Sequence, residues 1–187
     1  VSGEVDIEDL IPEETCVFTL THEGYIKRTT LDTYQAQNRG GRGVQGMTQK
    51  DEDFTEEMYV GSTHDYMLFL TNQGRVYRLK GYQVPEGSRT AKGSHIVNLL
   101  QLQEGEKVTL MLQQKADVDE DNTYATMVTK QGLIKRTPLS QFRNIRKAGL
   151  IAIALNEGDS LVWSHLTKGD DEIIVATHDG AAIHFTE

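Results

Sequence analysis

The chain has 187 residues, a formal net charge of −9 and a single cysteine, Cys16. A lone cysteine excludes a disulfide framework and indicates a reducing compartment. No apolar run approaches the ~18 residues of a membrane helix, and residues 1–6 lack the basic and apolar regions of a signal peptide, so we expect a soluble, cytoplasmic chain without a membrane partner.

The chain begins with an acidic stretch, residues 1–14, which predicts a linker leading into a folded array. After it, one pattern occurs four times: an apolar strand, a three-residue turn that ends in glycine, and a return strand that mostly carries basic residues. The copies are residues 16–28, 66–78, 124–136 and 172–184, and their turn glycines are 50, 58 and 48 residues apart. Such a period is typical of a radial β array. We therefore predict an all-β chain, a β-propeller or β-pinwheel with about three to four blades, roughly half of a ring.

Each complete blade is expected to contain four strands. Glycine ends each hairpin turn because it supplies the positive φ required there. The predicted blades are blade 1 at about 15–64, blade 2 at about 65–122, blade 3 at about 123–170 and the start of blade 4 at 171–187. After the hairpin, third strands are predicted at 44–47, 95–100 and 150–155, behind Gly43, Gly93 and Gly149, and fourth strands at 58–60, 108–112 and 161–164. No segment shows a sustained helical period, so no helix is predicted.

The sign of the charge alternates in register with the repeat. Net charge is +4 over 24–50, +4 over 74–95 and +6 over 130–149, whereas the intervening segments 51–66, 103–121 and 156–172 carry −6, −4 and −4. Because equivalent positions of successive blades lie along one rim, the basic segments predict a continuous positive belt on the outer rim. The alternative is that these charged residues only lie on solvent-exposed loops and bind no partner. The aromatic residues Tyr34, Tyr82 and Phe142 are expected to pin the connecting loops to the blades rather than to stack on bases.

The sharpest motif is Gln37-Asn38-Arg39-Gly40-Gly41-Arg42-Gly43. Glycines let a backbone turn tightly and approach a phosphate with its N–H groups exposed, and arginine adds bidentate, salt-sensitive phosphate contacts. Weaker versions of the motif occupy residues 87–93 and 143–149. The candidate DNA-binding residues are Gln37, Arg39, Gly40, Gly41, Arg42 and Gly43 in the motif, and Lys27, Arg28, Arg75, Arg78, Arg89, Lys92, Lys135, Arg136, Arg143, Arg146 and Lys147 elsewhere.

Together, the hairpin Gly24-Tyr-Ile-Lys-Arg28 and this motif resemble a six-bladed β-pinwheel, the C-terminal DNA-wrapping domain of the DNA gyrase A subunit. Six of the seven positions in 37–43 match that family's Gln-Arg-Arg-Gly-Gly-Arg-Gly box, and Asn38 replaces an arginine. The resemblance covers essentially the whole chain. It implies a module that bends duplex DNA around its outer rim and so allows negative supercoiling.

The resemblance also implies that this segment is the non-catalytic part of an ATP-hydrolysing type IIA topoisomerase. Its partners would be double-stranded DNA, the gyrase B subunit, and the remainder of the gyrase A subunit. The cleavage tyrosine, ATP and Mg²⁺ would belong to other parts of the holoenzyme, so no cofactor is expected in this segment.

Two other functions remain open. The corresponding domain of topoisomerase IV is similar but typically lacks an intact box, and a protein-interaction propeller would use the faces of the ring instead of its rim. No catalytic or metal site is predicted. The stretch Asp117-Val-Asp119-Glu-Asp121 begins like a calcium loop, but Asn122 stands where the loop needs glycine and Val128 where it needs glutamate.

Overall fold

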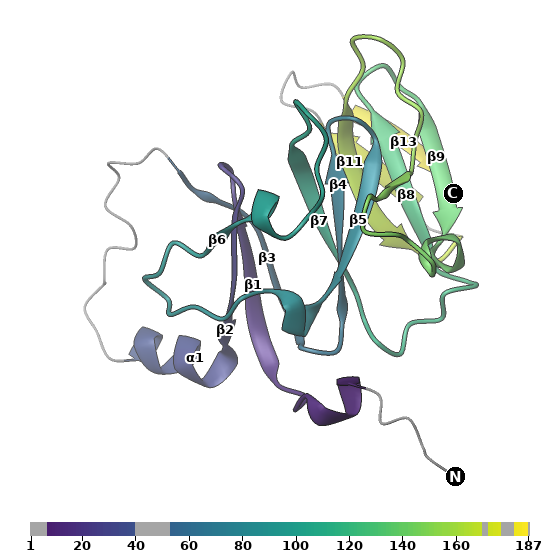
Figure 1. Cartoon of the computed structure of the whole chain (residues 1–187). Coiled ribbons are helices and arrows are strands. Elements are labelled where there is room, and N and C mark those ends of the chain that lie inside the picture. Colours follow the sequence, from purple (N-terminus) through teal and green to yellow (C-terminus); the bar gives the residue numbers. More distant parts are fainter. Residues whose placement is uncertain (1–6, 40–52, 170–171, 177–181, 187) are drawn as a thin grey trace. The chain divides into compact units, whose positions relative to one another are not determined.

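The computed structural model describes residues 7–39, 53–169, 172–176 and 182–186 (Figure 1). The chain divides into two compact units. Unit 1 comprises residues 1–67 and 79–100, and unit 2 comprises residues 68–78 and 101–187. Strands in antiparallel sheets dominate both units, which confirms the predicted all-β class.

Unit 1 contains one four-stranded sheet. Strands β1 (Thr15–Thr21) and β2 (Tyr25–Thr30) form its central hairpin, β3 (Thr55–Ser62) pairs with β1, and β6 (Ser94–His95) pairs with β2. Strand β1 is buried on both faces, because neighbouring residues Val17 and Phe18 are 2% and 0% exposed. An apolar, β-branched and aromatic run of this kind favours a central strand with packing on each side.

Unit 2 holds most of the second sheet and all of the next two. The second sheet has the order β10-β5-β4-β7, the third the order β11-β8-β9, and the fourth is a hairpin of β12 and β13. Their strands are β4 (Tyr66–Thr71), β5 (Arg75–Lys80), β7 (Val108–Gln114), β8 (Tyr124–Thr129), β9 (Ile134–Pro138), β10 (Leu150–Ile151), β11 (Leu161–Thr167), β12 (Glu172–Ala176) and β13 (Ala182–Thr186). One buried cluster, which includes Leu68, Val76, Met127 and Phe142, forms the core of the unit.

The predicted hairpins are confirmed. They are β1–β2, β4–β5, β8–β9 and β12–β13. Gly24, Gly74 and Gly132 end the first three turns with φ of 92°, 74° and 91°, in the region that glycine adopts without strain. The fourth turn glycine, Gly180, lies outside the described residues.

The predicted third strands are much shorter than expected. Only Ser94–His95 and Leu150–Ile151 pair, and η4 (Ile96–Asn98), a 3-10 turn, follows the first of them. Some apolar residues beyond the pairs turn into the core instead of continuing the strand: Ile96 and Ile153 are 2% and 4% exposed. Each short strand pairs with the return strand of the preceding repeat, β6 with β2 and β10 with β5. Successive repeats are therefore joined by strand exchange. The third strand predicted at 44–47 lies outside the described residues.

The structure contains an α-helix that the sequence did not predict. After β2 comes α1 (Leu31–Arg39). Thr30 directly before it and Asp32 in its first turn are residue types that favour the start of a helix. A helix of nine residues is too short to show a sustained period. Short 3-10 turns follow the other return strands, η3 (Gly81–Gln83) after β5 and η5 (Leu139–Phe142) after β9.

These three helical segments carry the aromatic residues that were expected to act as anchors. Phe142 is 1% exposed within the core of unit 2. Tyr34 and Tyr82 are half-buried, and the Tyr34 hydroxyl lies 4.0 Å from the sulfur of Met58. Packing of this kind is consistent with anchoring of the connections.

The end of the predicted linker packs on unit 1. It contains η1 (Ile7–Leu10), and the carboxylate of Glu8 lies 3.0 Å from the ammonium of Lys80. The Thr63 hydroxyl donates to the carbonyl of Pro12 at 3.0 Å. The segment from Glu8 onward is thus fixed to the turn between β3 and β4.

Candidate nucleic-acid interface

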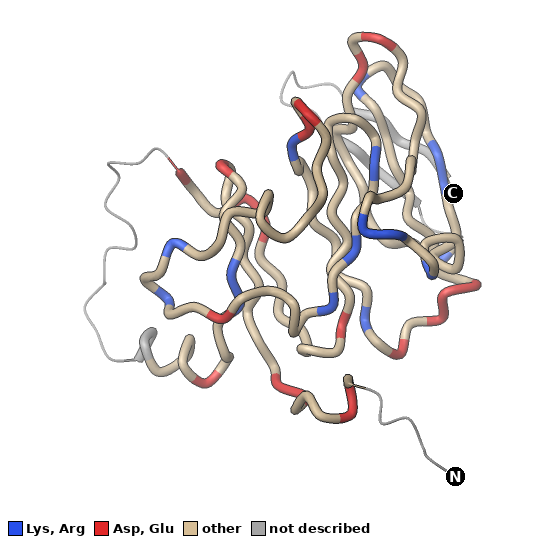
Figure 2. The backbone as a smooth tube through the Cα atoms, in the orientation of Figure 1, with Lys and Arg blue, Asp and Glu red and all other residues tan. Residues whose placement is uncertain are grey.

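The basic residues of the repeats lie on two kinds of element. Some stand on the return strands β2, β5 and β9, and others stand on the connecting loops 84–93 and 143–149. In Figure 2, the basic positions of β2 and those of the loop that precedes β6 lie side by side within unit 1. Each unit shows how such a loop is attached to the return strand of the preceding repeat.

Lys27 of β2 is enclosed by the loop of the next repeat. Its ammonium donates hydrogen bonds to the carbonyls of Ser88, Arg89 and Ala91 at 3.0, 2.6 and 2.8 Å. A lysine has three N–H donors, so all of them are used here. Burial lowers the pKa of Lys27, and the nearby charge of Arg89 lowers it further.

Arg28 fastens the start of the same loop. Its Nε donates to the carbonyl of Val84 at 2.7 Å, its backbone N–H donates to the carbonyl of Pro85 at 3.1 Å and its own carbonyl accepts from Gly87 at 2.9 Å. The loop therefore runs along β2 through both side-chain and backbone bonds.

The cations of that loop have a different environment. The guanidinium of Arg89 lies 5.2 Å from the ring centre of Tyr34, and the ammonium of Lys92 lies 4.2 Å from that of Tyr25. Both distances are within the range of a cation–π interaction, which orients a cation while leaving its N–H groups able to bind other acceptors. Neither side chain donates a hydrogen bond to another residue in the described part of the chain. Lys92 is exposed and Arg89 is half-buried.

Unit 2 repeats the attachment with other residues. On β5, a guanidinium nitrogen of Arg75 donates to the carbonyl of Ala148, and Arg78 donates to the carbonyl of Arg143 at 2.7 Å. Arg75 is also 3.8 Å from the buried carboxylate of Glu106. Loop 143–149 is thus bound to β5 as loop 84–93 is bound to β2.

Loop 143–149 carries three exposed cations. Arg143 forms an ion pair with Glu120 at 2.8 Å, and the hydrogen bond that its guanidinium donates to that carboxylate raises the pKa of Arg143. Arg146 and Lys147 have no side-chain partner among the residues that the structure describes. These two cations are open to an external anion.

On β9 the return-strand residues are exposed. Lys135 has no side-chain partner in the described ranges, while Arg136 lies 4.3 Å from the ring centre of Tyr124 and donates to the carbonyl of Gly169 at 3.3 Å. The basic groups of β9 are therefore exposed, whereas those of the first two return strands are only partly exposed. Lys27, Arg28, Arg75 and Arg78 are half-buried and bound to loop carbonyls.

Much of the predicted motif lies beyond the described part of the chain. Gly40, Gly41, Arg42 and Gly43 lie outside the described residues. Gln37 and Arg39 belong to the last turn of α1, and their side chains are likewise outside the description. Nine of the described candidate cations form two groups: the "loop cations" Arg89, Lys92, Arg143, Arg146 and Lys147, and the "clamp cations" Lys27, Arg28, Arg75 and Arg78. Lys135 and Arg136 of β9 belong to neither group.

Sequence reasoning missed three acidic residues that stabilise the hairpin turns. Asp53 accepts a hydrogen bond from the backbone N–H of Glu23, and Asp159 accepts one from that of Gln131, both at 2.9 Å. Glu106 occupies the equivalent place in the second repeat. The available signal was their spacing: each acid stands two residues before the strand that ends its repeat.

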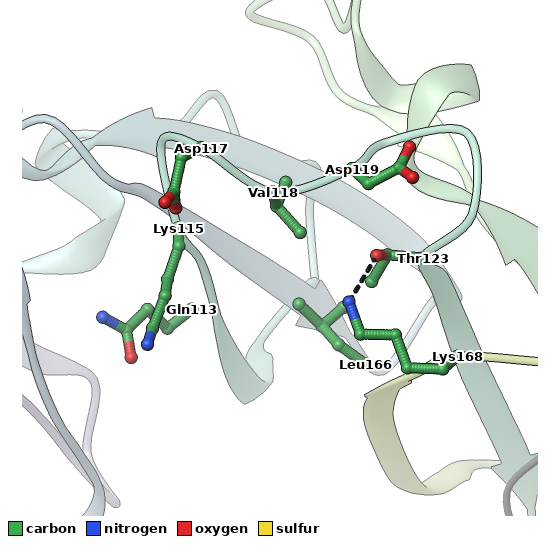
Figure 3. A pocket seen from close by; sticks show the side chains of 8 residues that line it. All are labelled: Gln113, Lys115, Asp117, Val118, Asp119, Thr123, Leu166 and Lys168. Atoms are coloured by element: carbon green, nitrogen blue, oxygen red, sulfur yellow. Dashed lines mark hydrogen bonds between the residues drawn. The ribbon is translucent and has the colours of Figure 1, made fainter.

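A shallow hollow of about 360 Å³ lies in unit 2, away from the loop cations in the sequence (Figure 3). It is lined by Gln113, Lys115, Asp117, Val118, Asp119, Thr123, Leu166 and Lys168. Lys168 donates to the Thr123 hydroxyl at 3.1 Å, and the Asn122 amide bonds Asp119 and lowers the pKa of its carboxyl. Two lysines and two aspartates leave this hollow without net charge, so it has no evident preference for an anion.

Metal ligands and membrane-spanning helices are both missing from the described part of the chain. There, no three His, Cys, Asp or Glu side chains are grouped so that they could hold a metal ion. None of its helices has the length and apolar character needed to cross a membrane.

Comparisons with known proteins agree with the predicted resemblance. The family model for the DNA gyrase C-terminal domain, beta-propeller, matches residues 17–60, 65–115 and 124–168. The DNA gyrase A protein of Clostridium acetobutylicum is 54% identical over 185 residues, which are 99% of this chain and 22% of that protein. This chain thus spans about a fifth of the length of that relative.

Two solved structures share the architecture. The crystal structure of the C-terminal domain of DNA topoisomerase IV superimposes with a TM-score of 0.75 at 30% identity, over 94% of this chain and 53% of that one. The structure of the DNA gyrase A C-terminal domain gives a TM-score of 0.67 at 27% identity, over 92% and 55% of the two chains. The resemblance and the β-propeller architecture are both confirmed, and this chain belongs to the family of DNA gyrase C-terminal β-propeller domains.

Proposed function

We propose that this chain is the DNA-binding and DNA-wrapping module of a DNA gyrase, which bends duplex DNA along the loop cations of successive repeats. One observation carries the proposal. In both units, a basic loop is bound to the return strand of the preceding repeat, and exposed cations such as Lys92 and Arg146 remain on that loop. Each repeat therefore presents positive charge on the same connecting loop. A polyanion with a regular backbone requires cations that recur in this way.

The mechanism is electrostatic. Loop cations replace condensed counterions on the phosphates, and the released counterions favour binding. Bending a duplex of ~20–30 base pairs costs on the order of 1–6 kcal/mol, which the phosphate contacts offset. Contacts to phosphates carry no sequence information, so we expect little base readout.

The remaining partners follow from the family. We propose that the chain works in the cytoplasm with a gyrase B subunit, together with the remainder of a gyrase A subunit. In this scheme, strand cleavage and ATP hydrolysis, with its Mg²⁺, are performed by residues of the holoenzyme outside this segment. The segment itself is non-catalytic and binds no cofactor.

The nearest alternative is the corresponding domain of topoisomerase IV, because one structural relative is a topoisomerase IV domain. The box at 37–43, with its three glycines and two arginines, favours the gyrase role over this alternative. A protein-interaction propeller is the alternative from another class, and it would not require the loop cations.

The test is the salt dependence of binding to long duplex DNA by the full chain, measured between ~50 and ~200 mM salt. We expect log K to fall linearly with log salt, with a slope of about −0.9 per neutralised phosphate. Replacing Arg146 and Lys147 by alanine should make the slope shallower by about 1.8 in total. Lys107→Ala is the matched control, because it removes an exposed lysine from an acidic segment and should leave the slope unchanged. Absent binding at low salt, or binding that ignores salt, would support the protein-interaction alternative.

A further inference from the structure

We propose that Lys27 contributes to DNA binding as a positioning residue: it holds loop 87–93 around its ammonium so that Arg89 and Lys92 face the phosphates. This inference rests on the proposed function, and it assigns to Lys27 a role different from the direct phosphate contact that its charge suggests. Three features of the structure support it, namely the convergence of carbonyls, the fit of the lysine stem and the contrast with the next repeats.

Three carbonyl oxygens converge on one point. Those of Ser88, Arg89 and Ala91 all lie within 3.0 Å of the Lys27 nitrogen. Carbonyl dipoles that point their negative ends at each other repel unless a cation lies between them. The curled form of the loop therefore depends on the ammonium of Lys27. Because the ammonium has no fourth donor, it cannot also bind a phosphate without releasing a carbonyl.

The loop also fits the stem of Lys27 at both of its ends. A Cβ built on Gly87 would lie 3.6 Å from the Cβ and Cδ of Lys27, and one built on Gly93 would lie 3.1 Å from the Lys27 Cβ and 2.5 Å from the carbonyl oxygen of Ile26. Only glycine fits at position 93, where the φ is also 92°, whereas a Cβ at position 87 would be in ordinary van der Waals contact with the stem. The loop thus wraps around a single side chain of the preceding repeat, from which it is separated by about sixty residues of sequence.

While its carbonyls accept hydrogen bonds from Lys27, the loop exposes several polar side chains. Ser88, Thr90 and Lys92 are exposed. Arg89 and Lys92 are each steered by an aromatic ring, Tyr34 and Tyr25. Two cations and two hydroxyls on one short loop are suited to phosphate oxygens. Lys27 fixes the backbone that carries these groups.

In the next repeat, the loop is held on the return strand without a lysine. Tyr77 stands at the position of Lys27, three residues after the turn glycine, and Arg75 supplies the bond to Ala148. In the third repeat the equivalent residue is Lys135, which is exposed and has no partner among the described residues. The same residue type at the same repeat position therefore has two environments, which provides a matched control.

The experiment is a double-mutant cycle on the full chain, with the salt slope of duplex binding as the readout. Lys27→Met keeps the stem and removes the donors. If Lys27 positions the loop, this variant loses both loop contacts, and the slope becomes shallower by about 1.8. In a background that already carries Arg89→Ala and Lys92→Ala, Lys27→Met should then have no further effect on the salt slope. Lys135→Met should instead change the slope by about 0.9 in both backgrounds, because its contact is independent.

Two outcomes would overturn the proposal. A change of about 0.9 caused by Lys27→Met in both backgrounds would show a direct phosphate contact. An unchanged slope in both would show that the loop does not need Lys27. A parent chain whose binding does not depend on salt would instead refute the proposed function, so the two failures are distinguishable.

A second variant separates charge from geometry. Lys27→Arg retains the charge, but a planar guanidinium does not match three carbonyls arranged around a point. The positioning role therefore predicts a shallower salt slope for this variant, whereas a direct phosphate contact predicts an unchanged slope. Amide hydrogen exchange provides the check on folding. Backbone amides of residues 88–92 should exchange faster in Lys27→Met, while those of β1 and β2 keep their protection. If Lys27→Arg lost protection in the loop without a change of the salt slope, that result would also count against the proposal.

Discussion

The carboxylate of Glu106 is fully enclosed within unit 2. Its two oxygens accept hydrogen bonds from the hydroxyls of Tyr77 and Thr71 at 2.6 and 2.7 Å, and from the backbone N–H of Gln103 at 2.8 Å. The guanidinium of Arg75 lies 3.8 Å away. Burial and the hydrogen bond to this carboxylate raise the pKa of Tyr77. A residue that looks like one of many loop acids is thus the centre of a buried polar network.

We therefore expect Glu106→Ala to lower the free energy of unfolding by about 3 kcal/mol, because it removes the acceptor of the buried donors and the ion pair with Arg75. Glu106→Gln keeps one acceptor oxygen and should cost less. The control is Glu104→Ala, an exposed acid two residues away, which should change the free energy by less than about 0.5 kcal/mol. Denaturant unfolding measures all three variants, and equal stability of Glu106→Ala and Glu104→Ala would contradict the role of the network.

At this scale, the sequence predicts the turn glycines but not the partners of the charged residues. Gly24, Gly74 and Gly132 follow from local geometry, because a three-residue turn needs positive φ at one position. The acceptors of Lys27 lie 61 to 64 residues further along the chain. Charge is visible in the sequence, whereas the acceptor that satisfies it is set by tertiary packing.

Among the elements, the exchanged strands β6 and β10, which pair with the preceding repeat, depend most on single backbone positions. Gly149 opens β10 with a φ of 76°, and a Cβ there would lie 2.8 Å from a ring carbon of Tyr77. Both the dihedral and the space therefore demand glycine. Gly105 has a similar φ of 72°, but a Cβ there would have no heavy atom of the described residues within 4 Å.

This pair gives a matched prediction. Gly105→Ala should lower the free energy of unfolding by about 1 kcal/mol, the cost of a left-handed backbone in an L residue. Gly149→Ala should lower it by about 3 kcal/mol, because overpacking against Tyr77 adds to that cost. Hydrogen exchange should also show faster exchange at Arg75 and Val76, the partners of β10. If the two variants were equally stable, the close approach of Gly149 to Tyr77 would not matter for the pairing of β10 with β5.

The hairpins could be predicted because strand, turn and return strand are adjacent in the sequence. The third strands were predicted as longer strands. Their shortness and their pairing with the preceding repeat could not be predicted, because a pair of two residues leaves no periodic pattern. Helix α1 was missed for a related reason. It spans fewer than three turns, so only the start signals at Thr30 and Asp32 indicate it.

For the whole molecule, the repeat period predicts the array because each repeat needs the next to complete its sheet. The net charge of −9 does not reveal a DNA-binding surface, since acidic and basic segments alternate within every repeat. The box at 37–43 is the element that the family resemblance links most directly to wrapping. Its contribution is best tested by separating affinity from the length of DNA that is bent.

We predict that replacing Arg39 and Arg42 together by alanine reduces wrapping more than affinity. A short duplex can bind any of the loop cations, so its dissociation constant should rise only a few-fold, whereas a wrapped duplex must satisfy every cation along its path and overcome the bending energy. The measurement is the change in linking number when nicked circular DNA is sealed in the presence of the full chain, beside the affinity for a duplex of about 15 base pairs. The variant with Lys107→Ala and Lys115→Ala also removes two exposed lysines, and it should leave both readouts unchanged. Equal linking-number changes for the box variant and the parent would mean that the box has no special part in bending.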